Sequence, residues 1–220
     1  MAKRTRGVRS AEAAGHLPGE AREAGRDGAR AVQPLHGARV LVGVTGGIAA
    51  YKTAMLVSRL AQAGAEVTVA MTDAATKFVT PLTFQALSGR PVYTSPWQHI
   101  ESSDPQHIAL ASAATVAIVA PCTMDCLATL ATGRTDDVVT LILSAVDRAK
   151  TPVLLAPAMN TVMWQQPSTT RNVATLKSDG FVIVGPEDGW QACRNVGPGR
   201  MSEPEDLFRQ ICVHAGRRPE

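Results

Sequence analysis

An asparagine stands among soft apolar side chains directly after a predicted buried strand. The strand is the run TPVLLA at positions 151–156, and the stretch PAMNTVMW that follows it places Asn160 between Met159 and Met163. An amide has two donor hydrogens and two acceptor lone pairs, which need partners if the side chain is buried. A clamp explains this pattern better than core packing: the amide would bind a substrate carboxylate or amide, and a methionine would cover an apolar face of the substrate.

A second candidate site is the stretch VTGGIAAYK, which places Thr45, Gly46 and Gly47 at a strand-to-helix turn. Free N–H groups at the start of a helix, together with the helix dipole, favour a phosphate. The spacing fits neither G-x-G-x-x-G nor a Walker loop, so it favours a mononucleotide over a dinucleotide. The alternative is a tight turn that needs small residues. Thr72, at the end of the next predicted strand, would donate a second hydroxyl to the same phosphate.

Two further side chains are candidates for acid–base chemistry. His107 opens a predicted helix and is either a proton carrier or a packed surface residue. Cys193 lies in a glycine-rich loop and is either an inert apolar residue or a thiol acid. Cys122 and Cys126 form a C-x3-C pair, but no second cysteine pair or histidine cluster completes a zinc site, so we expect no metal.

These residues all lie near the ends of predicted strands. Strands are expected at 38–45, 65–72, 115–121, 151–157 and 181–186, with an edge strand at 90–94; helices are expected at 46–64, 107–114, 168–180 and 203–215, as two short pieces within 73–89, and at 123–149 with an interruption near Gly133. Alternating strands and helices predict a doubly wound parallel α/β sheet, whose ligand lies beyond the carboxyl ends of the strands. Five strand-end loops should therefore converge on one site.

Composition sets the domain organisation. The 220 residues suit one domain, the net charge of +3 does not indicate nucleic acid, and no apolar run approaches the length of a membrane span. Residues 1–36 are rich in Ala, Gly and Arg without an apolar run, which predicts a disordered, dispensable extension. We expect the folded domain at 37–213 and a short tail at 214–220. Four cysteines are few for a disulfide scaffold and fit the reducing cytoplasm.

The motifs together resemble one known family. From Arg39 to Glu205 the stretches GVTGGIAAYK, MTDAATKFVTPLTFQALSG, HIALA, APAMNTVMW and ACRNVGPGRMSEP occur in the order typical of the homo-oligomeric flavin-containing cysteine decarboxylases. PAMNTVMW satisfies that family's P-x-M-N-x-x-M-W signature in full. The resemblance implies a single flavodoxin-like (Rossmann-type) domain, FMN as the cofactor, and a homotrimer or dodecamer with the FMN site at a subunit boundary.

The resemblance also implies roles for individual residues. FMN would be bound by Gly46, Gly47, Ile48, Thr72, Phe78, Thr123, Asp125 and Ala158. The catalytic residues would be His107 and Cys193, together with Asn160, and the substrate would be held by Asn160 and Met163. His107 would act as a base or orient the substrate, and Cys193 would protonate the final intermediate.

The implied activity is FMN-dependent decarboxylation of 4′-phosphopantothenoylcysteine to 4′-phosphopantetheine in coenzyme A biosynthesis. Oxidising the cysteine thiol to a thioaldehyde gives the carboxylate an electron sink, and returning a hydride and a proton saturates the product. The presence of Cys193 favours this saturated product. The alternatives are a peptidyl-cysteine decarboxylase that releases an enethiol, a non-catalytic FMN-binding regulatory subunit, a flavin prenyltransferase, and a nucleotide-binding module without redox chemistry.

One position departs from the family pattern. Where the family has P-A-S-A-N-T, this chain reads PCTMDC, so that Asp125 replaces the asparagine. An ionised carboxylate accepts hydrogen bonds but cannot donate them, and it repels a substrate carboxylate. Three interpretations follow: Asp125 is protonated, it contacts the flavin or a backbone donor, or the activity is altered.

Overall fold

The chain folds around a parallel sheet that is covered by helices on both faces. The computed structural model describes residues 33–98 and 105–217; the rest of the expected extension (1–32) and of the expected tail (218–220) lies outside the described residues. Leu35, inside the expected extension, is buried, so packing begins before residue 37. In the described part, no helix has the length and apolar character that crossing a membrane requires.

The central sheet has six strands in the order β3-β2-β1-β4-β5-β6, and all of its pairings are parallel. Its strands are β1 (Arg39–Val44), β2 (Glu66–Met71), β3 (Val92–Tyr93), β4 (Val116–Cys122), β5 (Val153–Pro157) and β6 (Val182–Ile183). Without the two-residue edge strand β3, the order is that of a flavodoxin-like sheet. The predicted doubly wound α/β fold is therefore confirmed.

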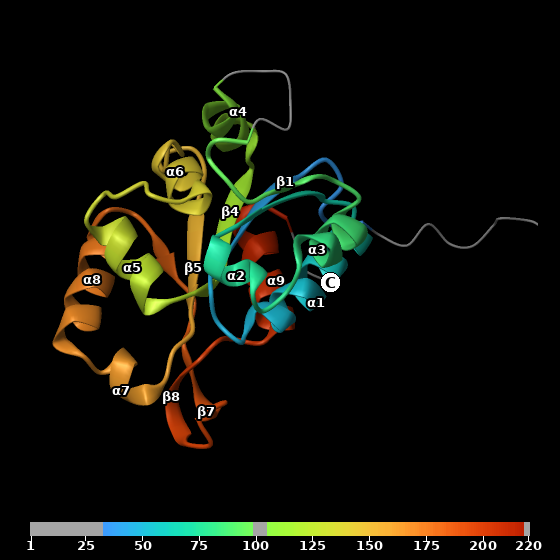
Figure 1. The fold of residues 1–220 in the computed structure, drawn as a ribbon. Coiled ribbons are helices and arrows are strands. Elements are labelled where there is room, and N and C mark those ends of the chain that lie inside the picture. The colour runs from blue at the N-terminus through green and yellow to red at the C-terminus, as the bar shows by residue number, and fades with distance from the viewer. Residues whose placement is uncertain (1–32, 99–104, 218–220) are drawn as a thin grey trace, which may run out of the picture. The chain divides into compact units, whose positions relative to one another are not determined.

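Nine helices lie in the described part of the chain (Figure 1). They are α1 (Ala50–Gln62), α2 (Asp73–Thr76), α3 (Pro81–Ser88), α4 (Gln106–Ala113), α5 (Met124–Ala131), α6 (Val138–Ser144), α7 (Thr161–Trp164), α8 (Pro167–Ser178) and α9 (Pro204–His214). The predicted break near Gly133 falls between α5 and α6, and the predicted break near Pro81 falls between α2 and α3.

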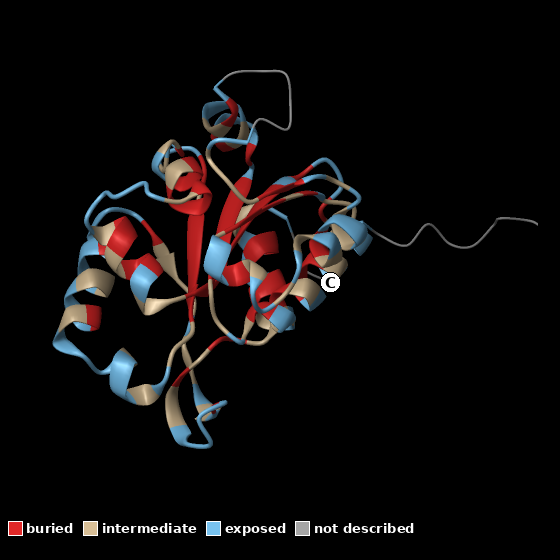
Figure 2. Ribbon diagram, in the orientation of Figure 1, coloured by how far each residue is buried: buried red, intermediate tan, exposed pale blue. Residues whose placement is uncertain are grey.

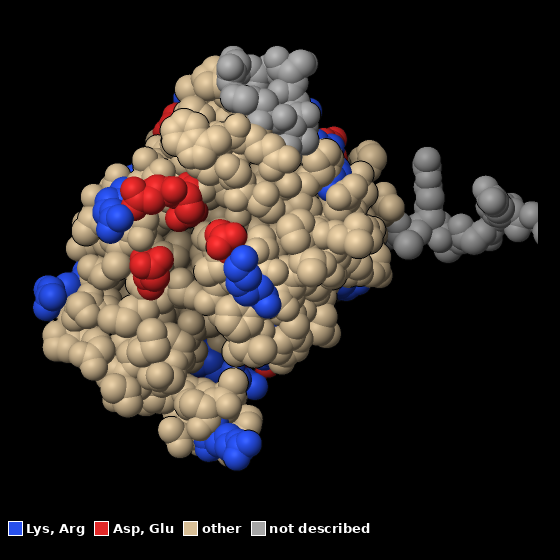
Figure 3. Space-filling view, viewed as in Figure 1, with Lys and Arg blue, Asp and Glu red and all other residues tan. Residues whose placement is uncertain are grey.

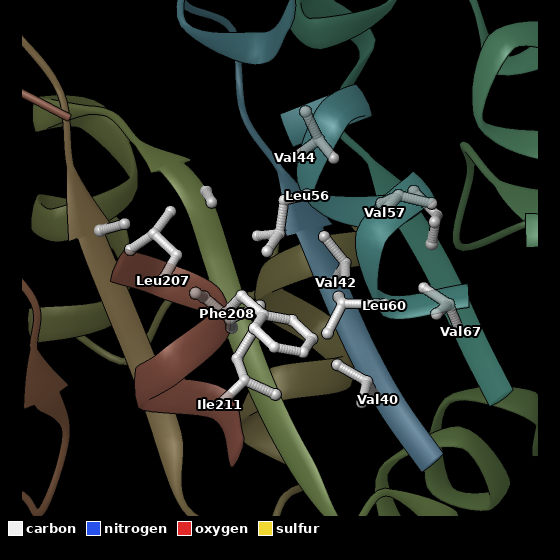
Figure 4. Packing of buried hydrophobic residues seen from close by; sticks show 14 of the residues in the cluster. Val40, Val42, Val44, Leu56, Val57, Leu60, Val67, Leu207, Phe208 and Ile211 are labelled. Atoms are coloured by element: carbon white, nitrogen blue, oxygen red, sulfur yellow. The ribbon is translucent and has the colours of Figure 1, made fainter. Parts of the chain in front are cut away.

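The core has two layers because side chains alternate across each strand. Val40, Val42 and Val44 of β1 pack with α1, α3 and α9 on one face (Figure 4), whereas Leu41 packs with α4, α5, α6 and α8 on the other. Every residue of β4 and β5 is buried, as is usual for the middle of a parallel sheet, and Figure 2 shows this buried centre. Both faces are thus closed, which leaves the strand ends for a ligand.

A hairpin near the carboxyl edge of the sheet was not predicted. Strands β7 (Glu187–Trp190) and β8 (Val196–Arg200) pair antiparallel as a separate two-stranded sheet. The connection between them carries Cys193. β8 contacts α7, so the hairpin brings this cysteine to the PAMNTVMW segment.

Candidate functional site

A cavity of about 1180 Å³ opens where the carboxyl ends of β1, β4 and β5 meet the hairpin. In the sheet order, the connections from β1 and β4 lead away in opposite directions, and a doubly wound sheet opens a crevice at such a point. Ten of the twelve site residues predicted from the sequence line this cavity: Gly46, Gly47, Ile48, Thr72, Thr123, Asp125, Ala158, Asn160, Met163 and Cys193. The expected convergence of the strand-end loops is therefore observed.

Four of the helices that begin at the cavity have a side-chain N-cap, and each capping residue lines the cavity. Thr72 caps α2, Thr123 caps α5, Asp137 caps α6 and Asn160 caps α7, in each case by accepting a hydrogen bond from a backbone N–H. The positive ends of these helix dipoles therefore point toward the cavity, which favours an anionic ligand.

The turn before α1 offers donors for a phosphate. Gly47 N–H donates to Thr45 O at 2.9 Å, but the N–H groups of Gly46, Ile48 and Ala49 have no acceptor among the described residues. A Cβ on Gly46 would collide with the Cβ of Ala74, so only glycine lets the start of α2 approach this turn so closely. Three free N–H groups at a helix start fit the phosphate of a mononucleotide.

A buried threonine, not predicted as a site residue, joins two of the loops. Thr45 Oγ1 donates to Pro121 O at 2.7 Å and accepts from Thr123 N–H at 3.1 Å, and its side chain is buried. The hydroxyl oxygens of Thr72 and Thr123 accept from Ala75 N–H and Cys126 N–H respectively. Because those two hydroxyls accept at oxygen, each keeps a proton that it can donate to a ligand.

Asn160 divides its hydrogen-bonding capacity between the fold and the cavity. Its Oδ1 accepts from Met163 N–H at 2.8 Å, which caps α7, and the residue is exposed. The amide nitrogen has no hydrogen-bond partner in the described part of the chain. The side chain is thus an exposed cap with two unused donor hydrogens, rather than a buried amide that is satisfied by the core.

The cations at the cavity are already paired. Lys52 Nζ lies 2.7 Å from Glu203 Oε1, and the same oxygen lies 3.1 Å from an Nη of Arg200. The other Nη of Arg200 lies 3.1 Å from Glu187 Oε2. The Nε of Arg200 is buried and has no partner among the described residues. Neither cation is therefore free to bind an anion without giving up a carboxylate.

Asp125 places an unpaired carboxyl group at the cavity. It is exposed in the first turn of α5, lines the cavity, and has no ion-pair or hydrogen-bond partner in the described residues. Figure 3 shows small groups of acidic side chains over the region of α2, α5 and α6. No backbone donor within residues 33–98 and 105–217 binds Asp125, so the interpretation in which it accepts a backbone hydrogen bond is not observed there.

The cysteine pair of β4 and α5 is packed away from solvent. Cys122 and Cys126 are both buried and free. A hydrogen bond with Cys122, followed by burial, raises the pKa of the Cys126 thiol, so this thiol stays protonated at neutral pH. Across residues 33–98 and 105–217, no group of three His, Cys, Asp or Glu side chains is placed to hold a metal ion.

Two predicted site residues lie outside the cavity. Phe78 is half-exposed after α2, and His107 is partly buried in the first turn of α4. In Figure 1, α4 lies at the opposite end of the sheet from the hairpin. α4 shares a different cavity with Arg39 and Glu66, the first residues of β1 and β2. The fold of one chain therefore does not bring His107 to the other site residues.

Sequence reasoning missed several side chains that line the cavity. They are Thr45, Lys52, Asp137, Gln191, Arg200 and Glu203. The signal was present for Gln191, Arg200 and Glu203, which are polar residues in the segment that carries Cys193. Thr45 and Lys52 lie within the quoted motif VTGGIAAYK, but their contacts with Pro121 and Glu203 are set by tertiary structure.

Comparison with known proteins gives consistent matches. Residues 29–216 match the family model described as Flavoprotein. Over 176 residues the chain is 47% identical to the coenzyme A biosynthesis bifunctional protein CoaBC of Vibrio vulnificus, an alignment that covers 80% of this chain and 43% of that protein. The chain thus spans less than half of the length of this curated relative.

This chain also aligns with nearly the whole length of solved structures that have the same fold. A cysteine-to-serine mutant of PPC decarboxylase, complexed with pantothenoylaminoethenethiol, matches with a TM-score of 0.73 at 30% identity, over 80% of this chain and 97% of that chain. The FMN-dependent cysteine decarboxylase SpaF matches with a TM-score of 0.70 at 28% identity, over 82% of this chain and 98% of that chain.

Proposed function

The chain belongs to the Flavoprotein family, and from this membership we propose that its cavity binds FMN and decarboxylates 4′-phosphopantothenoylcysteine to 4′-phosphopantetheine, a step toward coenzyme A. The observation that carries the proposal is the shared cavity: Asn160 and Met163 from one segment and Cys193 from another line the same space as the free N–H groups before α1. The free cysteines and the small-molecule substrate fit a protein of the reducing cytoplasm.

The residues at the cavity fit FMN. The N–H groups of Gly46, Ile48 and Ala49 would hold its phosphate, and the hydroxyls of Thr72 and Thr123 would donate to it. This donor set is neutral, so the helix dipoles supply the positive potential for the phosphate charge. When bound, FMN supplies a reversible two-electron acceptor next to the substrate thiol.

The remaining chemistry falls to side chains of this chain. The free amide hydrogens of Asn160 would donate to the cysteine carboxylate of the substrate, and Met163, partly exposed beside it, would pack on the adjacent carbon chain. Cys193 would protonate the enethiolate carbon that is left after loss of CO2, and because Cys193 is exposed, water can return a proton to its sulfur. Replacing Cys193 with Ser should therefore preserve CO2 release and stop formation of the saturated product.

We also propose that the working unit is a homotrimer or a dodecamer in which His107 of one copy reaches the cavity of a neighbour. Two facts support this: His107 lies away from the cavity of its own chain, and apolar side chains are exposed beside the cavity, on Ile48 in the turn before α1 and on Tyr51 and Met55 of α1 itself. Light scattering of the FMN-loaded protein tests it. A monomer that retains FMN and activity would refute the arrangement.

The deciding experiment is turnover of 4′-phosphopantothenoylcysteine followed by mass spectrometry, after the visible spectrum of the purified protein has been recorded. A yellow protein that yields saturated phosphopantetheine supports the proposal. A product lighter by two hydrogens would indicate an enethiol-forming decarboxylase instead.

A further inference from the structure

A buried glutamine connects the PAMNTVMW segment to the loop that carries Cys193. Gln191 follows β7, is 7% exposed, and lines the cavity. Its Nε2 donates to Thr161 Oγ1 at 3.1 Å, Gly197 O at 3.2 Å and Pro198 O at 2.9 Å. Its Oε1 accepts from Thr161 N–H at 3.2 Å and from Cys193 Sγ at 3.5 Å.

These contacts permit only one orientation of the amide. Turned the other way, the Gln191 oxygen would face the carbonyl oxygens of Gly197 and Pro198, and its NH2 group would face the N–H of Thr161. The oxygen must therefore point toward Thr161 and Cys193. A buried amide with all of its neighbours matched in this way is rigid, because any rotation leaves buried polar groups unpaired.

Glycines allow the hairpin to approach the start of α7 closely. A Cβ on Gly197 would lie 2.6 Å from Thr161 Oγ1, and a Cβ on Gly199 would collide with the carbonyl oxygen of Met159. Gly199 also has a φ of 127°, in the region that favours glycine. Gly199 O accepts from Met159 N–H at 2.9 Å. Asn160 lies between two residues that are bound to the hairpin, so its position and that of Cys193 are fixed by the same contacts.

Among the described residues, the other hydrogen bonds that hold the loop around Cys193 are those of its own backbone. Gln191 N–H donates to Asn195 O at 2.9 Å, and Arg194 N–H donates to Gln191 O at 2.9 Å. Residues 192–196 are exposed, and Arg194 has a φ of 66°. The Gln191 amide is therefore the sole side-chain partner of the Cys193 thiol in the described part of the chain.

We propose that Gln191 is a positioning residue that fixes the Cys193 sulfur in one rotamer at the cavity, at a set distance from Asn160. The catalytic consequence rests on the proposed function. Rotation about the Cβ–Sγ bond then turns the S–H from Gln191 to the substrate carbon without moving the sulfur. The proton goes to the carbon of the enethiolate, the sulfur is left as a thiolate, and water reprotonates it. Restricting the sulfur to one position should speed this proton transfer more than it speeds the earlier loss of CO2.

The test uses the full-length, FMN-loaded protein with two substitutions. Gln191→Met keeps the length of the side chain and removes every hydrogen bond, whereas Gln191→Glu keeps the acceptor oxygen and replaces the NH2 donor group with a second oxygen. Gln165→Met, on an exposed glutamine after α7, is the matched control. Thermal unfolding and the visible flavin spectrum check that each variant is folded and loaded.

The first measurement is the ratio of enethiol to saturated product, with CO2 release measured in parallel. We expect Gln191→Met to raise this ratio at least about tenfold, with a smaller change in CO2 release, and Gln165→Met to match the unsubstituted protein. Gln191→Glu should release excess enethiol at pH 8 and recover the saturated product as the pH is lowered, because a protonated carboxyl has one donor and one acceptor, like the amide. A ratio unchanged in Gln191→Met, or independent of pH in Gln191→Glu, would overturn the proposal.

The second measurement does not depend on the substrate. Cys193 is the exposed cysteine of the four, so its alkylation by iodoacetamide can be followed by peptide mass spectrometry. Gln191→Met should change this rate at least about threefold relative to Gln165→Met, since the sulfur is no longer restrained. Equal rates would refute the positioning role. If the unsubstituted protein releases no CO2 from 4′-phosphopantothenoylcysteine while the alkylation rates differ, the proposed function fails and the positioning role stands. If Gln191→Met does not fold, both measurements are decided by the isosteric Gln191→Glu.

Discussion

The turn before α1 provides a test of the phosphate site with a built-in rescue. Gly46 has no side chain, and a Cβ added there would collide with Ala74 Cβ at the start of α2. The backbone of Ala74 is close as well, with its carbonyl carbon at 3.1 Å and its Cα at 3.3 Å from the added atom. Gly46→Ala should therefore push α2 away from the turn and distort the N–H donors of Gly46, Ile48 and Ala49.

The size of the effect follows from the nature of the contact. Inserting a methyl group into a closely packed site costs about 1–3 kcal/mol. Because the strain is relieved by moving the donors that would hold the phosphate, most of this cost should appear as weaker FMN binding. At about 1.4 kcal/mol per factor of ten, the dissociation constant for FMN should rise roughly 5- to 150-fold.

Removing the opposing methyl group should reverse most of that loss. The double variant Gly46→Ala/Ala74→Gly deletes the colliding Cβ and leaves the contacts at 3.1 and 3.3 Å, which small shifts can relieve. Ala74→Gly alone should bind FMN nearly as well as the unsubstituted protein. Its glycine should lower the stability of α2 by about 0.5–1 kcal/mol. FMN titration of the apoprotein by flavin fluorescence measures all four. Normal binding by Gly46→Ala, or no recovery in the double variant, would show that this turn does not hold the phosphate.

Three further outcomes are expected. Asn160→Asp should keep the cap of α7 and the stability of the fold, yet raise KM for the substrate at least tenfold, because the donor hydrogens are gone. Asn160→Ala should lose both the cap and the donor hydrogens, and should lower the free energy of unfolding by about 1 kcal/mol. Urea unfolding measures the loss of the cap, and steady-state kinetics measure the loss of the donors. The pKa of Cys126 is raised in the fold, first by its hydrogen bond with Cys122 and then by burial. The contribution of this thiol to stability is therefore fully present below the ordinary thiol pKa of about 8.5 and is lost as the pH rises through the raised value. Between pH 7 and pH 10, the free energy of urea unfolding should fall more for the unsubstituted protein than for Cys126→Ala. Asp125→Asn should lower KM for an anionic substrate about fivefold at low salt, which corresponds to the loss of roughly 1 kcal/mol of repulsion. The change in KM should be much smaller at 1 M salt, because salt screens the charge. A change in KM that is independent of salt would contradict the electrostatic explanation.

The sheet was predictable because its signals are local. The strands β1, β2, β4 and β5 are short and rich in valine, leucine, isoleucine and alanine, and each is followed by a helical pattern. A parallel sheet that is buried on both faces requires such runs. Once their order along the chain is known, the rule that ligands lie beyond the carboxyl ends places the loops together without any knowledge of side-chain contacts.

The hairpin could not be predicted in the same way. The sequences of β7 and β8, EDGW and VGPGR, contain glycine, proline and charged residues and have no apolar alternation. Their pairing depends on contacts with a distant segment, above all those of Gln191 with Thr161 and of Gly199 with Met159. The chemistry of Cys193 could be suggested from its loop, but the partner of its thiol is fixed only by tertiary structure.

Asn160 shows the same limit at a single residue. The sequence suggested an amide among apolar neighbours that would need partners if buried. In the fold it is exposed, and its oxygen caps α7, which begins after the end of β5 at Pro157. A cap needs only one of the two polar atoms of the amide, which leaves the NH2 group available to a ligand, as the predicted clamp requires.

The charges at the cavity suit a reaction that destroys a carboxylate. Lys52 and Arg200 both pair with Glu203, so the proposed partner of the substrate carboxylate is the neutral amide of Asn160, not a cation. A free cation there would stabilise the substrate carboxylate most strongly in the ground state, because the negative charge of the carboxylate leaves the carboxyl group as CO2 forms. Stabilising the ground state in this way would raise the barrier. Asp125 would also destabilise the bound carboxylate, because its negative charge repels that of the substrate. Under the proposed function this repulsion disappears as the carboxylate becomes CO2, so Asp125→Asn should lower KM and lower kcat with it.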